Sequence, residues 1–269
     1  MAYTGKKILI VGGGAGIGAA IACEAARQGA DVAIADVSVK SLEDTAQRIK
    51  DAGHTALTCP VDISDGRSVA RMAEWCAESF GTPDILLNTV IAYPSTFSGL
   101  DDMKVDDWKT AFEANFFGYV RVLEHLLPAM RVKGSGTIVL TASTVALLPD
   151  PSAAILFRYK AVKHAVLGLS TSLSVALKGT GLKSICFCPS LTATPGAIDG
   201  LRSTGLPGIE EILAIAQQPE DVARFFLAEL EKADFLICAH EGYRELLVEF
   251  AADQLNPAPF IETHFPSAA

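Results

Sequence analysis

Residues 7–18 read KILIVGGGAGIG, and this stretch decides the fold. Its first part, Lys7–Val11, is an apolar run typical of a buried β-strand, and apolar residues recur at helical spacing over 16–28. Glycines between the two allow the backbone to turn tightly and to approach a phosphate closely. The start of the helix offers free N–H groups and the positive end of its dipole to that phosphate. The stretch therefore predicts a dinucleotide-binding turn between a first strand and a first helix.

The rest of the chain alternates short β-rich runs with longer amphipathic stretches. Further strands are expected at Asp31–Asp36, 55–60, Ile85–Asn88, 136–142, 182–189 and 235–239. Further helices are expected from a Ser38 cap to about residue 52, and at 64–80, 106–132, 154–178, 219–233 and 244–254. Such alternation is typical of a parallel sheet with helices on both faces. The sequence predicts an α/β fold, a single-domain Rossmann-type doubly wound sheet of about seven strands over residues 1–269, with a substrate loop at 190–218.

The composition argues against several classes of function. The chain has 269 residues, of which 50% are hydrophobic and 20% are charged, with a formal net charge of −9. An acidic balance disfavours binding to nucleic acid or to an anionic membrane, where basic patches are expected. No apolar run has the length of a membrane span, and Lys6 and Lys7 lead into a short run broken by glycines. We expect a cytoplasmic protein with a small-molecule partner, no nucleic acid and no membrane.

The six cysteines are expected to be free thiols. A chain of this size with ample apolar residues needs no disulfide bonds for its stability. Cys186 and Cys188 place two thiols on one face of an expected strand, but without a nearby His or second Cys pair they make a poor metal site. We therefore interpret the cysteines as buried structural residues and expect no bound metal.

Asp36 indicates which dinucleotide is bound. It ends the second expected strand, 18 residues beyond Gly18. A carboxylate there accepts hydrogen bonds from the adenosine ribose hydroxyls and repels a 2′-phosphate. The glycine stretch contains no Lys or Arg that could pair with such a phosphate. The residues favour NAD over NADP; the alternative is that Asp36 is only a solvated carboxylate at a strand end.

An ordered set of motifs resembles the short-chain dehydrogenase/reductase family. In chain order these are Gly12-x-x-x-Gly16-x-Gly18, Asp62-Ile63, Asn88, Asn115-x-x-Gly118, Ser143, Tyr159-x-x-x-Lys163, and Pro189 with Thr194. The resemblance covers about residues 6–194, and its specificity comes from the order of the motifs. It implies an oxidoreductase that transfers a hydride between a nicotinamide cofactor and an alcohol or carbonyl carbon.

Tyr159 and Lys163 lie four residues apart, and hence on one face of the expected helix. A tyrosine normally has a pKa near ~10 and is a poor base at neutral pH. A neighbouring ammonium and the positive nicotinamide ring both favour the phenolate, and a pKa of about 7 requires roughly 4 kcal/mol of such stabilisation. In this interpretation Tyr159 removes the alcohol proton as hydride leaves, or protonates the carbonyl in the reverse direction.

The resemblance also implies roles for the remaining motif residues. Ser143 would hydrogen-bond the substrate oxygen, Lys163 would also hold the nicotinamide ribose, and Asn115 would hold a water that links Lys163 to solvent. The catalytic set implied is Asn115, Ser143, Tyr159 and Lys163. The cofactor contacts implied are Gly12, Gly16, Ile17, Gly18, Asp36, Asp62, Ile63, Asn88, Tyr159, Lys163, Pro189, Thr192 and Thr194. Taken singly, these could be a surface serine, a helix-facing lysine and a polar helix kink.

Several positions depart from the family pattern. Val11 stands where a threonine is usual, and Asn88-Thr89-Val90-Ile91 replaces Asn-Asn-Ala-Gly. Pro189-Ser190 replaces Pro-Gly, and His240-Glu241-Gly242-Tyr243 replaces Asp-Gly-Gly near the end. Ser143 and Tyr159 are further apart than is usual, which predicts an enlarged loop at 144–151. The lost glycine at Ile91 puts the local backbone beside the cofactor in question.

The expected substrate is a hydrophobic secondary alcohol or ketone. Substrate contacts should come from the loops 92–100, 144–151 and 190–218, beyond the carboxyl ends of the strands. Their apolar residues include Tyr93, Phe97, Leu147, Leu148, Ile198, Leu201 and Leu206. Arg158 and Arg202 are interpreted as solvated. The C-terminal part is similar to that of bacterial family members acting on aryl or benzylic secondary alcohols.

Three functions remain open at this point. The first is an NAD-dependent alcohol dehydrogenase, and the second is a carbonyl reductase that uses NADPH, against which Asp36 argues. The third is a nucleotide-sensing module without turnover, against which the complete set of catalytic motifs argues. We also expect a homodimer or homotetramer, because the helix at 154–178 is apolar over most of its circumference.

Overall fold

The chain is built on one parallel sheet. A computed structural model describes residues 2–92, 99–101, 103–205 and 208–265. The seven strands have the order β3-β2-β1-β4-β5-β6-β7, so the chain winds outward in both directions from the β1–β4 pair. They are β1 (Lys7–Val11), β2 (Asp31–Asp36), β3 (Ala56–Pro60), β4 (Ile85–Asn88), β5 (Gly136–Thr141), β6 (Leu182–Cys188) and β7 (Leu236–Cys238). The predicted doubly wound sheet is confirmed.

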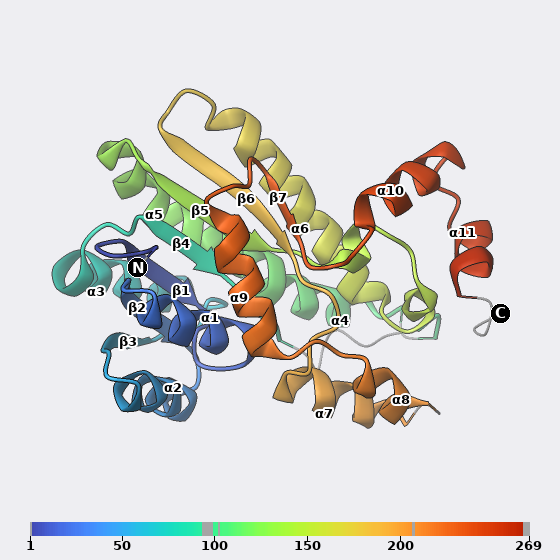
Figure 1. Cartoon of the computed structure of the whole chain (residues 1–269), viewed down its shortest axis with the longest axis horizontal. Helices are drawn as coiled ribbons and strands as arrows, with labels where there is room; N and C mark the ends of the chain where they lie inside the picture. Colours follow the sequence, from blue (N-terminus) through green and yellow to red (C-terminus); the bar gives the residue numbers. More distant parts are fainter. Residues whose placement is uncertain (1, 93–98, 102, 206–207, 266–269) are drawn as a thin grey trace.

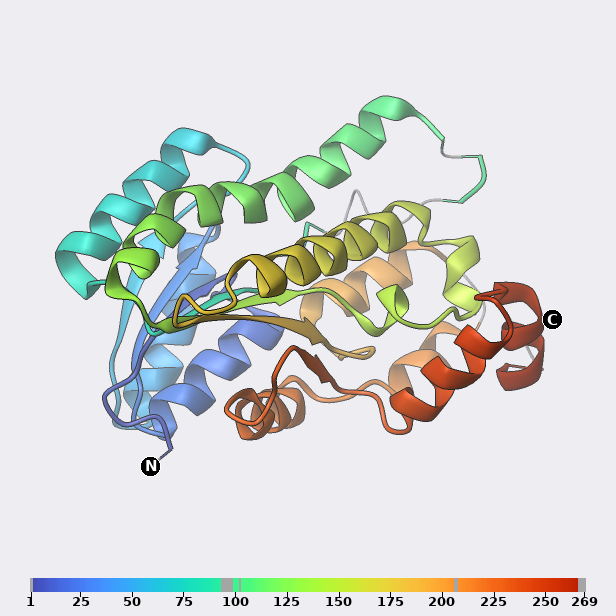
Figure 2. The same cartoon turned by 90° about the horizontal axis from the view of Figure 1, so that it is seen from above.

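Helices cover both faces of this sheet (Figures 1 and 2). One face carries α1 (Gly16–Arg27), α2 (Val39–Asp51) and α9 (Pro219–Leu230). The other face carries α3 (Gly66–Trp75) with its π-helical end η1 (Cys76–Phe80), α4 (Val105–Phe112), α5 (Gly118–Lys133) and α6 (Phe157–Ala176). In the described part of the chain, no helix is long and apolar enough to cross a membrane.

Alternate side chains of the strands feed two cores. Leu9 of β1 packs in the core under α3, α5 and α6, whereas Ile8 and Ile10 pack in the core under α1, α2 and α9. Burial on both faces explains why the strands read as near-continuous apolar runs in the sequence. All six cysteines are free, and Cys186 and Cys188 are completely buried in β6, as expected of structural thiols.

The helix predicted at 106–132 is interrupted. It consists of α4, a π-helical turn η3 (Glu113–Phe117) and α5, so the expectation of one regular helix is wrong in its middle. Asn115 lies in this turn and is fully buried. Its side-chain Nδ2 donates to the Ala111 carbonyl, the group that would pair with the Asn115 N–H in a regular α-helix.

The stretch predicted as a loop at 190–218 also contains regular structure. It forms α7 (Pro195–Ser203) and α8 (Ile209–Ala214). The Thr194 side chain caps α7 by accepting a hydrogen bond from the Ala197 N–H at 3.2 Å, with Pro195 in the first turn. The C-terminal segment forms two helices, α10 (Tyr243–Ala252) and α11 (Pro257–His264), which lie together at one end of the molecule (Figure 2).

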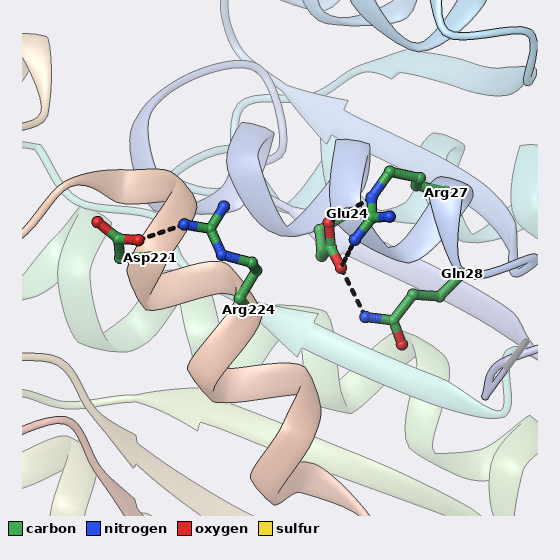
Figure 3. Close-up of polar contacts among 5 residues, drawn as sticks. All are labelled: Glu24, Arg27, Gln28, Asp221 and Arg224. Atoms are coloured by element: carbon green, nitrogen blue, oxygen red, sulfur yellow. Dashed lines mark hydrogen bonds and ion pairs between the residues drawn. The ribbon is translucent and has the colours of Figure 1, made fainter.

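Charged side chains line the outer side of the contact between α1 and α9 (Figure 3). The Glu24 carboxylate accepts hydrogen bonds from Arg27 at 2.6 and 2.9 Å and from Gln28 Nε2 at 2.7 Å. On α9, Arg224 pairs with Asp221 and adds a positive charge near Glu24. Burial alone would raise the pKa of Glu24, but the hydrogen bonds from Arg27 and Gln28 and the charges of Arg27 and Arg224 lower it below the ordinary value.

This lowered pKa predicts how stability depends on pH. Because the folded protein binds the Glu24 proton more weakly than the unfolded chain does, the contribution of Glu24 is complete above pH about 4.3 and is lost as pH falls further. Glu24→Gln should lower the free energy of unfolding at pH 7, as measured by urea denaturation. As the pH falls below about 4, the free energies of unfolding of the variant and the wild type should converge. The control is Glu43→Gln, an equal charge change on the exposed side of α2. A Glu24→Gln effect of the same size at every pH would contradict this account.

Candidate active site

The glycine turn at the end of β1 is closely packed. Gly12 and Gly16 adopt positive φ angles of 88° and 56°, which favour glycine. A Cβ atom on Gly18 would lie only 2.1 Å from the Gly12 carbonyl oxygen, so α1 can begin here only with glycine. The turn thus brings backbone N–H groups at the start of α1 close to the carboxyl edge of the sheet, where they can bind a phosphate.

Asp36 ends β2 beside this turn, as predicted. Its Oδ2 accepts a hydrogen bond from Gly14 N at 3.0 Å, and its Oδ1 accepts one from Ser38 N at 3.1 Å. Each carboxylate oxygen has a further lone pair, so both can still accept hydrogen bonds from a diol. The carboxylate therefore organises the glycine turn and presents a negative charge at its edge.

A cavity of about 360 Å³ opens along the carboxyl ends of β1, β2 and β4. Of the residues predicted to contact a cofactor, its lining contains Gly12, Gly16, Ile17, Gly18, Asp36, Asp62, Ile63 and Thr194. None of the described residues that line it is Lys or Arg. The cavity lies at the topological switch point, where doubly wound sheets bind nucleotides.

The remaining predicted cofactor residues lie at the same edge of the sheet but outside this cavity lining. Pro189 follows β6, and its carbonyl oxygen accepts a hydrogen bond from Thr144 N at 3.1 Å. Thr192 is buried and donates to the Ser190 carbonyl at 2.9 Å. Pro189 thus joins the segment after β6 to the turn after β5, whereas the Thr192 hydroxyl bonds within its own segment.

Asn88 shows that the site fits a polar ligand. Its side chain is 1% exposed at the end of β4, and within the described residues neither its Oδ1 nor its Nδ2 has a hydrogen-bond partner. Leaving both amide atoms unsatisfied in the interior costs free energy, which a ligand with donors and acceptors would recover. Together with the glycine turn and Asp36, this orphaned amide fits a dinucleotide.

Lys163 lies beneath Tyr159 in a closed environment. The Lys163 side chain is almost completely buried, and its Nζ donates a 2.8 Å hydrogen bond to the Thr141 carbonyl at the end of β5. The same Nζ lies 5.7 Å from the centre of the Tyr159 ring. Burial lowers the pKa of Lys163 to about 8, because removal from water disfavours the ammonium form.

The other two residues of the predicted catalytic set surround this pair. Ser143 follows β5 and is buried; its Oγ accepts a hydrogen bond from Val145 N at 3.4 Å. Asn115 Oδ1 accepts a hydrogen bond from Ala92 N at 2.7 Å, and its Nδ2 donates to Ala111 O at 2.9 Å. Helix α6 packs against η3, β5 and the turn η4 (Thr144–Ala146), which brings the segments of all four residues together. A water bound by Asn115 stays a prediction.

Two threonines that the sequence analysis missed hold the glycine turn. Thr89 Oγ1 donates to the carbonyl oxygens of Val11 and Gly12 at 3.2 and 3.1 Å. Thr45, in the middle of α2, donates to the Gly14 carbonyl at 2.9 Å and is buried. The sequence pointed to Thr89 only because this residue replaces the second Asn of the family motif Asn-Asn-Ala-Gly. Nothing in the sequence distinguished Thr45 from other polar helix residues.

The interpretation of Arg158 as solvated is wrong. Arg158 is 6% exposed, and its guanidinium pairs with Asp107 of α4 at 3.4 Å, because the first turn of α6 packs against α4. Arg202 of α7 is exposed as predicted and pairs with Glu210 of α8 at 2.9 Å.

Four of the apolar residues predicted to contact the substrate are described. Leu147, Leu148, Ile198 and Leu201 are half-buried in the loop after β5 and in α7. Tyr93, Phe97 and Leu206 lie outside the described residues. Tyr159, the buried Lys163 ammonium and Ser143 form a set that can exchange a proton with an alcohol or carbonyl oxygen.

Comparison with known proteins agrees with this geometry. Residues 6–200 match the short chain dehydrogenase family. The chain is 31% identical to cis-4-hydroxycyclohexanecarboxylate dehydrogenase of Sinomonas cyclohexanicum over 81% of this chain and 83% of that protein. It is 28% identical to 1-deoxy-11-beta-hydroxypentalenate dehydrogenase of Streptomyces exfoliatus over 89% of this chain and 84% of that protein.

A solved structure shows the same architecture. It is a short-chain dehydrogenase/reductase from Burkholderia phymatum in complex with NAD, with a TM-score of 0.81 and 25% identity, covering 96% of this chain and 98% of that chain. The family match spans the glycine turn, the predicted catalytic residues and strands β1 to β6. The chain therefore belongs to the short-chain dehydrogenase/reductase family, whose members are oxidoreductases acting on CH–OH groups.

Proposed function

We propose that the protein is an NAD-dependent oxidoreductase that transfers a hydride between the nicotinamide and a hydrophobic secondary alcohol or ketone. The observation that carries this proposal is the buried Lys163 ammonium against the Tyr159 ring. It lies at the same edge of the sheet as the glycine turn and Asp36. A charged lysine held out of water at this position favours the phenolate of Tyr159 over the phenol.

The proposed roles follow from the positions of the side chains. When bound, the cofactor supplies the hydride acceptor or donor. Tyr159 takes the hydroxyl proton from the alcohol, or returns it to the ketone oxygen in the reverse direction. Ser143 donates a hydrogen bond to that oxygen, and Lys163 holds the charge that makes Tyr159 a base near neutral pH.

The preference for NAD rests on charge. The Asp36 carboxylate stands at the cavity edge, where it can accept hydrogen bonds from two ribose hydroxyls but would repel a 2′-phosphate. Lys40 of α2, four residues further along the chain, is exposed and already paired with Asp44 at 2.6 Å. The charge of Asp36 therefore supports NAD and argues against the NADPH-dependent alternative.

The apolar residues of the loop after β5 and of α7 support a hydrophobic substrate. The relative from Sinomonas cyclohexanicum is named for a substrate whose hydroxyl is on a cyclohexane ring, which is a secondary alcohol. The relative from Streptomyces exfoliatus is named for a hydroxypentalenate. By analogy, we propose a cyclic or aryl secondary alcohol for this chain.

The first prediction concerns Tyr159. Tyr159→Phe should leave the Kd for NAD⁺ within about 3-fold and lower kcat by at least ~10²-fold, because only the proton-transferring oxygen is lost. Turnover is measured by the absorbance of the reduced cofactor, with a panel of cyclic and aryl secondary alcohols. The matched control is Tyr3→Phe. This variant also removes a buried phenol oxygen, but one that donates to the Leu227 carbonyl and takes no part in the proposed reaction. If Tyr159→Phe kept the kcat of the wild type, Tyr159 would be excluded as the acid/base. If the wild type bound NAD⁺ but turned over none of the alcohols, a nucleotide-sensing module would be favoured.

The second prediction concerns Asp36. In the wild type, kcat/KM should be higher with NAD⁺ than with NADP⁺, and Asp36→Asn should narrow this ratio by about 10-fold or more, the scale of one hydrogen bond to a charged group. Asparagine keeps an acceptor for Gly14 N but removes the charge. Asp31→Asn, at the opposite end of β2, controls for net charge. A wild-type preference for NADP⁺ would overturn the ribose argument.

We also propose that the protein assembles as a homodimer or homotetramer through α5 and α6. The exposed side of α6 carries small and polar residues besides Val175, so this helix is less apolar toward solvent than its sequence suggested. The proposed contact would instead use exposed apolar side chains near the start of α5, namely Phe117 at the end of η3 and Val120. A two-fold contact would cover both helices with their own copies.

Light scattering during size-exclusion chromatography tests this assembly. At micromolar concentration the wild type should have a mass of two or four times 28.4 kDa, and Val120→Glu should shift it toward a single chain. Val132→Glu, at the far end of the same helix and 90% exposed, is the matched control. A wild-type mass near 28 kDa across the peak would refute the proposal.

A further inference from the structure

Tyr119 is a completely buried tyrosine that none of the roles above uses. It is 0% exposed and follows Gly118 at the start of α5. Its ring lies under the catalytic pair: the Lys163 Nζ is 6.0 Å from the centre of the Tyr119 ring. Its hydroxyl donates a 3.0 Å hydrogen bond to the Val90 carbonyl, in the segment after β4.

The surroundings of Lys163 explain why such a ring matters. The groups that face its Nζ are the Tyr159 ring on α6, the Tyr119 ring on α5, the Thr141 carbonyl on β5, and the thiols of β6. The thiols of Cys186 and Cys188 favour the charged lysine only when they are ionised. The electron-rich face of an aromatic ring attracts a cation, and this attraction is largest where water is excluded. The Tyr119 ring therefore offsets part of the cost of burying the ammonium.

The hydroxyl of Tyr119 connects this environment to the cofactor cavity. Val90 lines the cavity and lies against the glycine turn, since a Cβ on Gly12 would be 2.8 Å from Val90 N. Val90-Ile91 stands where the family pattern has Ala-Gly. Burial raises the pKa of Tyr119 far above its ordinary value, so the phenol stays protonated and keeps donating to Val90 O. The Tyr119 side chain thus contacts both the Val90-Ile91 segment, through its hydroxyl, and Lys163, through its ring.

We propose that Tyr119 is a positioning residue with two separable functions: its ring keeps Lys163 charged, and its hydroxyl holds the Val90 segment against the cofactor. This inference rests on the proposed function for its consequence in catalysis. The lysine environment itself is a property of the protein without cofactor and can be measured without turnover.

The test separates the ring from the hydroxyl. Tyr119→Phe keeps the ring and loses the hydrogen bond to Val90, so it should weaken NAD⁺ binding by about 5-fold, the scale of one neutral hydrogen bond. It should leave the titration of Lys163 as in the wild type. Pentafluorophenylalanine at position 119 has nearly the shape of phenylalanine but no electron-rich face, so it should lower the pKa of Lys163 by about 1 relative to Tyr119→Phe.

The pKa of Lys163 is read by NMR of the 13Cε-labelled lysines in the cofactor-free protein. The Lys163 signal is identified by its absence in Lys163→Met. Leu126→Ala is the matched control, because it removes buried volume from the same helix and core without a ring at Lys163. This variant should lower the melting temperature and leave the titration of Lys163 unchanged.

The pH profile of kcat is the second measurement. Loss of charge on Lys163 removes the partner of the Tyr159 phenolate, so the alkaline limb should move to lower pH with the fluorinated ring but not with Tyr119→Phe. Equal lysine titration in both proteins would overturn the role of the ring, and unchanged NAD⁺ affinity in Tyr119→Phe would overturn the role of the hydroxyl. An altered titration in a protein without alcohol-dependent turnover would refute the proposed function and leave the lysine environment established.

Discussion

Gly12 and Gly18 come so close at the end of β1 that no side chain fits between strand and helix. A Cβ on Gly18 would lie 2.1 Å from the Gly12 carbonyl, and a Cβ on Gly14 would lie 2.9 Å from the Asp36 side chain. This close approach lets α1 begin directly over the carboxyl edge of the sheet. The cavity, the position of Asp36 and the bracing by Thr89 and Thr45 all depend on it. The shape of the proposed dinucleotide site is therefore a consequence of backbone packing.

The part of the site around Lys163 and Tyr159 depends on how well the protein compensates a buried positive charge. An ammonium without water is costly, and Lys163 has one carbonyl hydrogen bond and two aromatic rings in compensation. The compensation is incomplete, as its lowered pKa indicates. A charge of this kind suits the role that we propose for Tyr159, because the charge of Lys163 can respond to whether its neighbour is protonated. Packing of α5 and α6 on the sheet holds these groups in place.

The two halves meet at the segment after β4. There Asn88 leaves both amide atoms without partners in the described structure, Thr89 holds the glycine turn, and Val90 accepts from Tyr119. Ala92 N donates to Asn115 Oδ1 in the π-helical turn, so the interrupted part of the helix is tied to this segment. The segment that departs from the family motif is thus hydrogen-bonded to the end of β1 and the glycine turn, to η3 and to α5. The segment thus lines the cavity and connects it, through Tyr119, to Lys163.

The amino-acid sequence by itself determined the parallel sheet, the glycine turn and the motif residues, because strand burial and turn geometry depend on residues that are close in the chain. It also contains two helix N-caps that were not recognised as such: Thr194-Pro195 begins α7, and Asn256-Pro257 begins α11. The burial of Arg158, the role of Thr45 and the placement of Tyr119 under Lys163 were decided only by the tertiary structure. Tyr119 and Lys163 lie 44 positions apart on different helices, and no local pattern records which buried faces meet across a core.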